Sequence, residues 1–344
     1  HVRRALRSSQ QEGTMSELSR SAAYIQHAVG ALPAALRQAS AVPLPRLAQP
    51  ARRVLSTGIG LSEAPARLLA SQLADRGVCA RFCVTSQVAE HGRPDDLLVV
   101  FSQGLSPNAQ LALGDAPNVG TRWLVTSVEP GSATSAQAEF LASCLARGVH
   151  PIVIPPPAEA GALVRMVGPT VAALLALRLA ASLGADEELT RRLHEVPDRY
   201  RALPLELALD DSALGLIAVG MHPEWVHAHR WKLLETLLRD DPPIWEALQF
   251  AHGPLQAYYE RRLTLLVFEA GGRSPLVERI QATLQPGRHR LVRISSALPP
   301  PLAFFEHAAT LDTLLLHAVQ ASGRDLFDWP ARDADGPLYD LGNL

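Results

Sequence analysis

Two charged residues on one predicted helix have the types and the spacing for proton transfer. Lys232 and Glu235 lie three positions apart in the helical run that starts at Pro223, so their side chains share one helix face. Leucines flank the pair, and apolar surroundings raise the pKa of a carboxyl group toward the range that suits acid–base chemistry near neutral pH. The alternative is a solvated ion pair on the helix surface.

A histidine follows this helix at a break in the chain. His252 lies in the stretch QFAHGPLQ, between an apolar run and a Gly-Pro turn. A loop of this kind can present an imidazole into a cleft, where it exchanges protons. A histidine that only packs within the structure explains the position equally well, and the sequence around it leaves both interpretations open.

Two other loops carry short hydrogen-bonding residues directly after strand-like runs. The first, STGIGLS, contains Gly58, Gly60 and Ser62 at a predicted helix N-terminus. Backbone N–H groups and the helix dipole favour an anion at such a place. The alternative is that these residues only cap the helix and form turns. The second loop, FSQGLSPNA, supplies four further polar side chains: Ser102, Gln103, Ser106 and Asn108.

The elements that position these loops alternate between apolar strands and helices. This alternation predicts an α/β fold with parallel sheets covered on both faces, in which ligands bind at the carboxyl ends of the strands. The pattern restarts half-way, which predicts two doubly wound, Rossmann-like halves in tandem. A strand, glycine turn and helix are predicted over 52–77, long helices over 159–183 and 302–322, and further strands at 79–86, 95–104, 121–130, 150–157, 212–220, 262–271 and 289–296.

The same patterns divide the chain into five segments. We expect residues 1–14, which precede Met15, to be a remnant outside the fold or disordered. The remaining segments are an N-terminal helical segment over 15–50, a first half over 51–183, a charged helical linker over 184–204, and a second half with its tail over 205–344.

The second half contains a motif that resembles a known family. The stretch AVGMHPEWVHAHRWKLLETLL, followed by ALQFAHGPLQAY, resembles the tandem sugar isomerase (SIS) domain family, and in particular the isomerase half of glucosamine-6-phosphate synthase. That family has a Gly-ended strand, a Lys-x-x-Glu helix and a His-Gly-Pro-Leu loop, which match Gly220, Lys232, Glu235 and His252–Leu255 here. The similarity covers nearly the whole chain from Met15, including the order of the two halves.

The resemblance implies a role for each matching residue. Glu235 would move a proton between C1 and C2 of a sugar through an enediol, and His252 would open the sugar ring. Lys232 would place a cation near the developing enolate oxygen. Gly60, Ser62, Ser102, Gln103, Ser106 and Asn108 would bind the anionic group of the substrate. In this family the neighbouring subunit often supplies the histidine, which implies a homodimer with a shared active site.

Three departures from the family pattern limit what the resemblance implies. The serine loop of the family reads Ser-Gln-Ser-Gly-Glu-Thr, whereas this chain has Gly104 and Pro107 at two of its hydroxyl positions. The lysine of the family tail is missing, because Lys232 is the only lysine in the sequence, so an imine at the tail position is excluded. No N-terminal Cys precedes the fold, and we therefore expect no glutaminase half.

The composition narrows the range of partners. A net charge of −2 argues against a nucleic-acid surface, which needs a basic face, and the absence of a basic block argues against membrane-surface binding. The three cysteines, Cys79, Cys83 and Cys144, form no disulfide framework and no zinc motif. We expect a cytoplasmic protein without metal or cofactor.

These observations lead to three functional hypotheses. The first is an enzyme acting on an anionic sugar or sugar phosphate by enediol proton transfer, either an aldose–ketose isomerase or a related amino-sugar deaminase or deglycase. The second is a specialised-metabolism enzyme that uses the same machinery on a different substrate. The third is a non-catalytic regulator that binds a sugar phosphate. The altered serine loop leaves the identity of the anion open.

Overall fold

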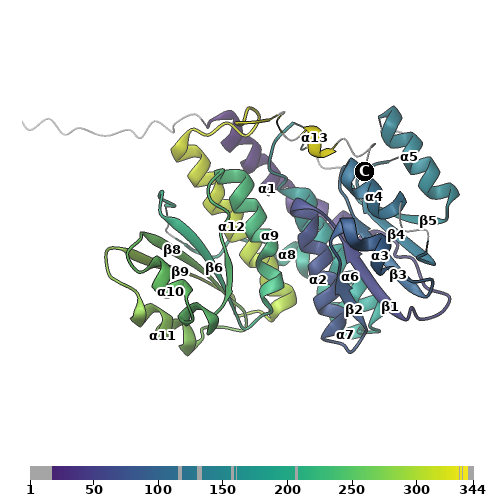
Figure 1. Cartoon of the computed structure of the whole chain (residues 1–344). Coiled ribbons are helices and arrows are strands. Elements are labelled where there is room, and N and C mark those ends of the chain that lie inside the picture. Colours follow the sequence, from purple (N-terminus) through teal and green to yellow (C-terminus); the bar gives the residue numbers. More distant parts are fainter. Residues whose placement is uncertain are drawn as a thin grey trace, which may run out of the picture.

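The computed structural model describes residues 18–114, 118–129, 134–155, 159, 161–205, 208–332, 334 and 336–339. The segment 1–14, for which we expected disorder or a remnant, lies outside the described residues. The described part forms two parallel sheets at opposite ends of the molecule, with a block of helices between them (Figure 1). The predicted α/β fold class with two halves is thereby confirmed.

The first sheet has the strand order β2-β1-β3-β4-β5, and every described pair is parallel. Its central strands β1, β3 and β4 are mostly buried on both faces, as helices on both sides require. In the register of β1 and β3, Val54 lies opposite Leu97. The elements of this half are β1 (Arg53–Thr57), α2 (Glu63–Ala74), β2 (Ala80–Phe82), α3 (Val88–His91), β3 (Asp96–Phe101), α4 (Pro107–Gly114), β4 (Thr121–Thr126), α5 (Ser135–Ala146), β5 (Val149–Val153) and α6 (Val167–Leu183).

The second sheet has the order β7-β6-β8-β9 and is also parallel. Its strand β7 was not predicted, because three residues between Pro243 and Ala247 give too short a pattern to recognise. The elements of this half are β6 (Ala213–Val219), α9 (His227–Leu237), β7 (Ile244–Glu246), α10 (Pro254–Tyr258), β8 (Leu263–Glu269), α11 (Pro275–Thr283), β9 (His289–Ser295), α12 (Pro300–Ser322) and α13 (Gly336–Tyr339).

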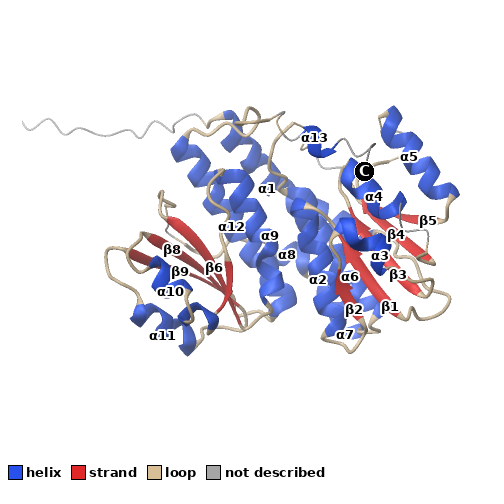
Figure 2. Cartoon of the chain, in the orientation of Figure 1, coloured by secondary structure: helices blue, strands red, loops and turns tan. Residues whose placement is uncertain are grey.

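The helices between the sheets bind the halves together. α1 (Arg20–Ala41) packs against α6 of the first half and α12 of the second, and α2 packs against α9. The charged linker forms two short helices, α7 (Glu187–Leu193) and α8 (Val196–Arg199). Figure 2 shows this helical layer between the two sets of strands. One continuous apolar core runs through it, and none of its helices within the described ranges has the length and apolarity of a membrane span.

The two faces of the second sheet carry different parts of the predicted site. Leu216 faces the central core together with Leu233 of α9. The next strand residue, Ile217, faces a separate outer cluster that contains Phe250. Because adjacent strand residues point to opposite faces, α9 lies on the inner face of the sheet, whereas the chain around His252 lies on the outer face.

Candidate functional site

The loop after β1 comes close to the predicted catalytic helix. Gly60 has a φ of +59°, a left-handed conformation that glycine adopts without strain, and it opens a short 3₁₀ turn, Gly60–Ser62, ahead of α2. A β-carbon at Gly60 would lie 3.8 Å from Oε1 of Glu235. The Glu235 carboxyl of the second half therefore faces the glycine loop of the first half.

Glu235 is half-buried on α9. Burial raises the pKa of its carboxyl from the ordinary 4.5 to about 8, although the positive charge of Arg165 partly opposes this shift. This is the direction that the flanking leucines lead us to expect. The group is mostly protonated at neutral pH, and once ionised it is a stronger base than an exposed carboxylate.

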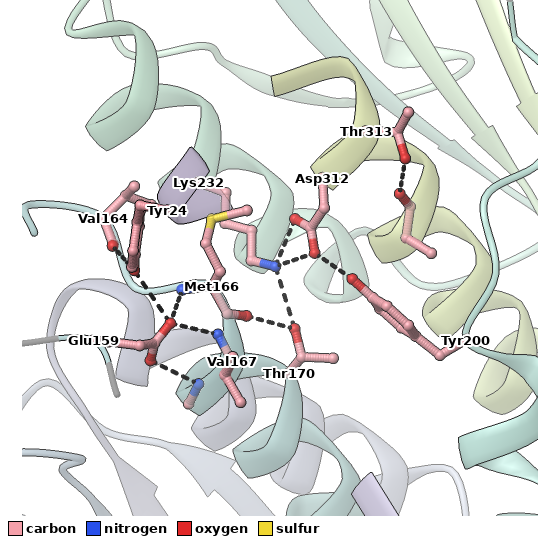
Figure 3. Close-up of polar contacts among 12 residues, drawn as sticks. Tyr24, Glu159, Val164, Met166, Val167, Thr170, Tyr200, Lys232, Asp312 and Thr313 are labelled. Carbon is pink, nitrogen blue, oxygen red and sulfur yellow. Dashed lines mark hydrogen bonds and ion pairs between the residues drawn. The ribbon is translucent and has the colours of Figure 1, made fainter. Parts of the chain in front are cut away.

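Lys232 does not pair with Glu235. Its ammonium group is buried and lies 2.8 and 2.9 Å from the two carboxylate oxygens of Asp312 on α12, and 3.2 Å from Oγ1 of Thr170 on α6. The hydroxyl of Tyr200 donates to the same carboxylate over 2.6 Å, as Figure 3 shows. Three acceptors match the three protons of the ammonium group, so this cation links helices of both halves.

The serine loop after β3 and the glycine loop after β1 meet at a small cavity. Ser62 lines it from the first loop, and Ser102 and Ser106 line it from the second. Ser102 is buried, and its Oγ accepts a hydrogen bond from the backbone N–H of Ser106 over 3.3 Å. The cavity has a volume of about 30 Å³, enough for one water molecule. Leu105, with a φ of +51°, packs into the core beneath the loop.

Gln103 and Asn108 do not line this cavity. The amide of Gln103 donates to the carboxylate of Glu159 over 3.2 Å and lies against Gly168, where a β-carbon would come within 2.1 Å of the Gln103 Oε1. Asn108 is half-buried in the first turn of α4. Gln103 instead lines a smaller neighbouring cavity together with Ser62 and Ser102. Of the predicted anion-binding residues, the structure thus brings the three serines and Gln103 close together and places Gly60 at Glu235.

Glu159 has a buried carboxylate, and we predicted this residue to lie inside a helix. The helix α6 begins only at Val167, because Gly161 turns the chain with a φ of +82°. The Glu159 carboxylate accepts backbone N–H groups from Met166 at 2.5 Å, Val167 at 2.6 Å and Gly168 at 3.1 Å (Figure 3). An internal anion therefore occupies the positive end of α6.

Arg165 was not among the predicted site residues. This half-buried arginine lies just before α6, and its positive charge lowers the pKa values of both Glu235 and Tyr24, although burial sets each of them above its ordinary value. No hydrogen bond or ion pair joins Arg165 to another described residue. In the sequence, the one indication of a role for Arg165 is that it stands next to the apolar run of a helix. Arg165 is therefore a positive charge that acts on Glu235, whereas the charge of Lys232 is bound to Asp312.

The sequence matches no family profile, and no curated protein is significantly similar to it. Solved structures are similar over nearly the whole chain. The tagatose-6-phosphate ketose/aldose isomerase from Escherichia coli gives a TM-score of 0.66 at 14% identity, covering 91% of this chain and 98% of that one. The C-terminal domain of glucosamine-fructose-6-phosphate aminotransferase from Francisella tularensis gives 0.64 at 12% identity, covering 89% and 98%. The chain has the tandem SIS fold.

A third similar SIS-like structure is named for a different reaction. The glucosamine-6-phosphate deaminase from Thermotoga maritima has a TM-score of 0.64 at 16% identity, covering 88% of this chain and 95% of that one. Identities this low establish the fold alone, and one fold supports many reactions. The function of this protein therefore depends on its own side chains.

His252 is exposed at the surface of the second SIS half. It ends a 3₁₀ turn, Gln249–Ala251, just before α10, on the face of the sheet opposite to α9. Because Glu235 lies on the inner face, one chain does not bring the two side chains together. The predicted ring-opening role of His252 thus requires a second subunit, and this role stays a prediction.

Proposed function

We propose that this protein is an enzyme that moves a proton between neighbouring carbons of an anionic sugar, with Glu235 as the acid–base group. The observation that carries the proposal is the Glu235 carboxyl, with a pKa of about 8, set against the glycine loop of the other half. An ionised group with this pKa can take a proton from a carbon next to a carbonyl, and the resulting acid can return it to the adjacent carbon.

The neighbouring residues support binding of an anionic sugar. Ser62, Ser102 and Ser106 place hydroxyl and backbone donors around one small cavity, which has to widen to admit a phosphate. The positive charge of Arg165 acts on Glu235, and a cation in this region would stabilise the negative charge that develops on the substrate oxygen during enediol formation. The reaction class, an aldose–ketose isomerase or an amino-sugar deaminase, depends on the substrate.

Deuterium exchange tests this proposal. The protein is incubated with a panel of aldose and ketose phosphates in deuterated water, and exchange at C1 and C2 is followed by NMR. We expect exchange with at least one ligand and its loss in Glu235→Gln, with binding retained. Glu187→Gln, an exposed position on α7, is the matched control and should exchange normally. Ligand binding without any exchange would refute enzymatic proton transfer.

A second candidate function is a sugar-phosphate-binding regulator without turnover. It is favoured by the engagement of Lys232 with Asp312, since that lysine is then not free to approach a substrate. The same experiment separates the two functions, because a regulator would bind a sugar phosphate tightly and leave its carbon-bound protons unexchanged.

We further propose that the active site is shared within a homodimer. The exposure of His252 and its place on the outer face support this. Mixing Glu235→Gln protein with His252→Ala protein would form hybrid dimers that contain one intact site. Recovery of part of the exchange activity on mixing is expected. No recovery, in a mixture shown to contain hybrid dimers, would contradict the shared site.

A further inference from the structure

A cavity of about 300 Å³ lies away from the candidate site, where the C-terminal ends of α1 and α6 meet α7. This volume is at the lower end of the range for small-molecule sites. Its lining combines two arginines and a histidine with hydroxyl groups: Arg46, Arg178 and His194 with Ser40, Ser182 and Thr190. Leu44 and Leu193 add an apolar wall, and none of the residues that line the cavity is acidic.

Arg178 is fixed in place by the backbone. Its Nη1 donates to the carbonyl oxygens of Ala39 and Val42 over 2.6 and 2.9 Å, which neutralises the carbonyl end of α1. Its Nε and Nη2 donate to none of the described residues. Burial lowers the pKa of Arg178, as expected for a guanidinium that has no carboxylate partner.

Three acidic residues around the cavity bind arginines outside its lining, whereas Glu187, exposed on α7, forms no ion pair with another described residue. Arg46 and His194 are exposed, and no hydrogen bond or ion pair joins either side chain to the rest of the described chain. The three acids are paired as follows: Asp186 with Arg76, Glu188 with Arg191 and Arg192, and Glu195 with Arg199.

We propose that this cavity, formed by α1, α6 and α7, is a second binding site that takes a small phosphorylated metabolite. The phosphate group would be bound by Arg46, Arg178 and His194, since guanidinium groups match its oxygens in geometry and charge. The carbon part of the ligand would lie on Leu44 and Leu193. The size of the cavity suits a monosaccharide phosphate rather than a dinucleotide.

The site is connected to the candidate active site by a single rigid element. Arg178 and Ser182 lie near one end of α6, whereas Gly168 and Thr170 near its other end contact Gln103 and Lys232. Ten residues of helix separate Gly168 from Arg178, a distance of about 15 Å. A ligand in the cavity would therefore bind apart from the serine loops, against the far end of the same helix.

Binding of glucose 6-phosphate, followed by ³¹P NMR and calorimetry at fixed ionic strength, tests this proposal. The protein carries Ser62→Ala and Ser102→Ala, so that the serine cavity contributes less to binding. Adding Arg46→Gln and His194→Gln should weaken binding at least tenfold, because two phosphate contacts are lost. The matched control, Arg279→Gln with His317→Gln, changes the same residue types at exposed positions outside the cavity and should leave the affinity unchanged.

Hydrogen exchange gives an independent readout. Glucose 6-phosphate should slow amide exchange in residues 40–46 and 190–194, which line the cavity. The proposal is overturned if millimolar glucose 6-phosphate does not bind, or if the Arg46/His194 variant binds as tightly as the control. These outcomes are independent of the proton-exchange activity, so the second site and the proposed function can fail separately.

Discussion

Replacing Glu235 by Gln should stabilise the protein, and the gain should depend on pH. The folded pKa of about 8 lies above the ordinary 4.5, so the folded state holds a proton that the unfolded state releases. The contribution of this proton to the free energy of unfolding is therefore complete below pH 4.5 and is lost as the pH rises toward 8. At pH 7 the loss is about 3.5 kcal/mol, from 2.5 pH units at about 1.4 kcal/mol each. Glutamine has the shape of the neutral acid and removes this loss.

Urea unfolding at pH 5 and at pH 8.5 measures this effect. The free energy of unfolding of Glu235→Gln should equal that of the wild type within about 1 kcal/mol at pH 5 and exceed it by roughly 4.5 kcal/mol at pH 8.5. Glu187→Gln, exposed on α7, should show no difference at either pH. An equal gap between variant and wild type at both pH values would refute the raised pKa, and with it the basis for placing proton transfer at Glu235.

Four further predictions follow from other contacts. The rate of deuterium exchange at low substrate concentration should rise with pH, reach half its maximum near pH 8 and level off above that, because Glu235 must be ionised to act as a base; a flat profile would contradict this role. Asp312→Asn should destabilise the protein by about 3–5 kcal/mol in urea unfolding, since it leaves the buried ammonium of Lys232 without its countercharge; Lys232→Met with Asp312→Leu should cost less. Burial lowers the pKa of His307 from 6.5 to about 4. The free energy of unfolding should therefore be highest above pH 6.5 and fall by up to about 3 kcal/mol as the pH drops toward 4. His307→Gln should flatten that decline. Ala185→Gly should raise the free energy of unfolding by up to about 1 kcal/mol, and with it the Tm, because Ala185 has a strained φ of +52°. A lower Tm would count against strain there.

The fold was predictable because its signals are local. Each long strand is an apolar run that ends in glycine, proline or a polar loop, as in DLLVVF over Asp96–Phe101, and such runs alternate with helices. The start of α6 was not predictable in this way. Its cap is Glu159, seven residues upstream of the first hydrogen-bonded amide, Met166, and no capping rule reaches that far along the sequence.

The candidate site was predictable only in part, because partners in space are far apart in sequence. The apolar flanks of Glu235 indicated its raised pKa. No residue pattern indicated that Lys232 would bind Asp312, 80 residues away, or that the charge of Arg165 would act on Glu235. Helical spacing suggested a contact between Lys232 and Glu235, but burial of the ammonium group made a carboxylate on α12 the better partner.

The burial of the only lysine has a practical consequence for measuring how the protein opens. Reagents that acylate amines find no lysine at the surface, because Lys232 is the single lysine in the sequence and is 1% exposed. Modification of its side chain thus requires the helices of the two halves to separate. The rate of acylation at Lys232, read by mass spectrometry, would report that separation directly, without any engineered label.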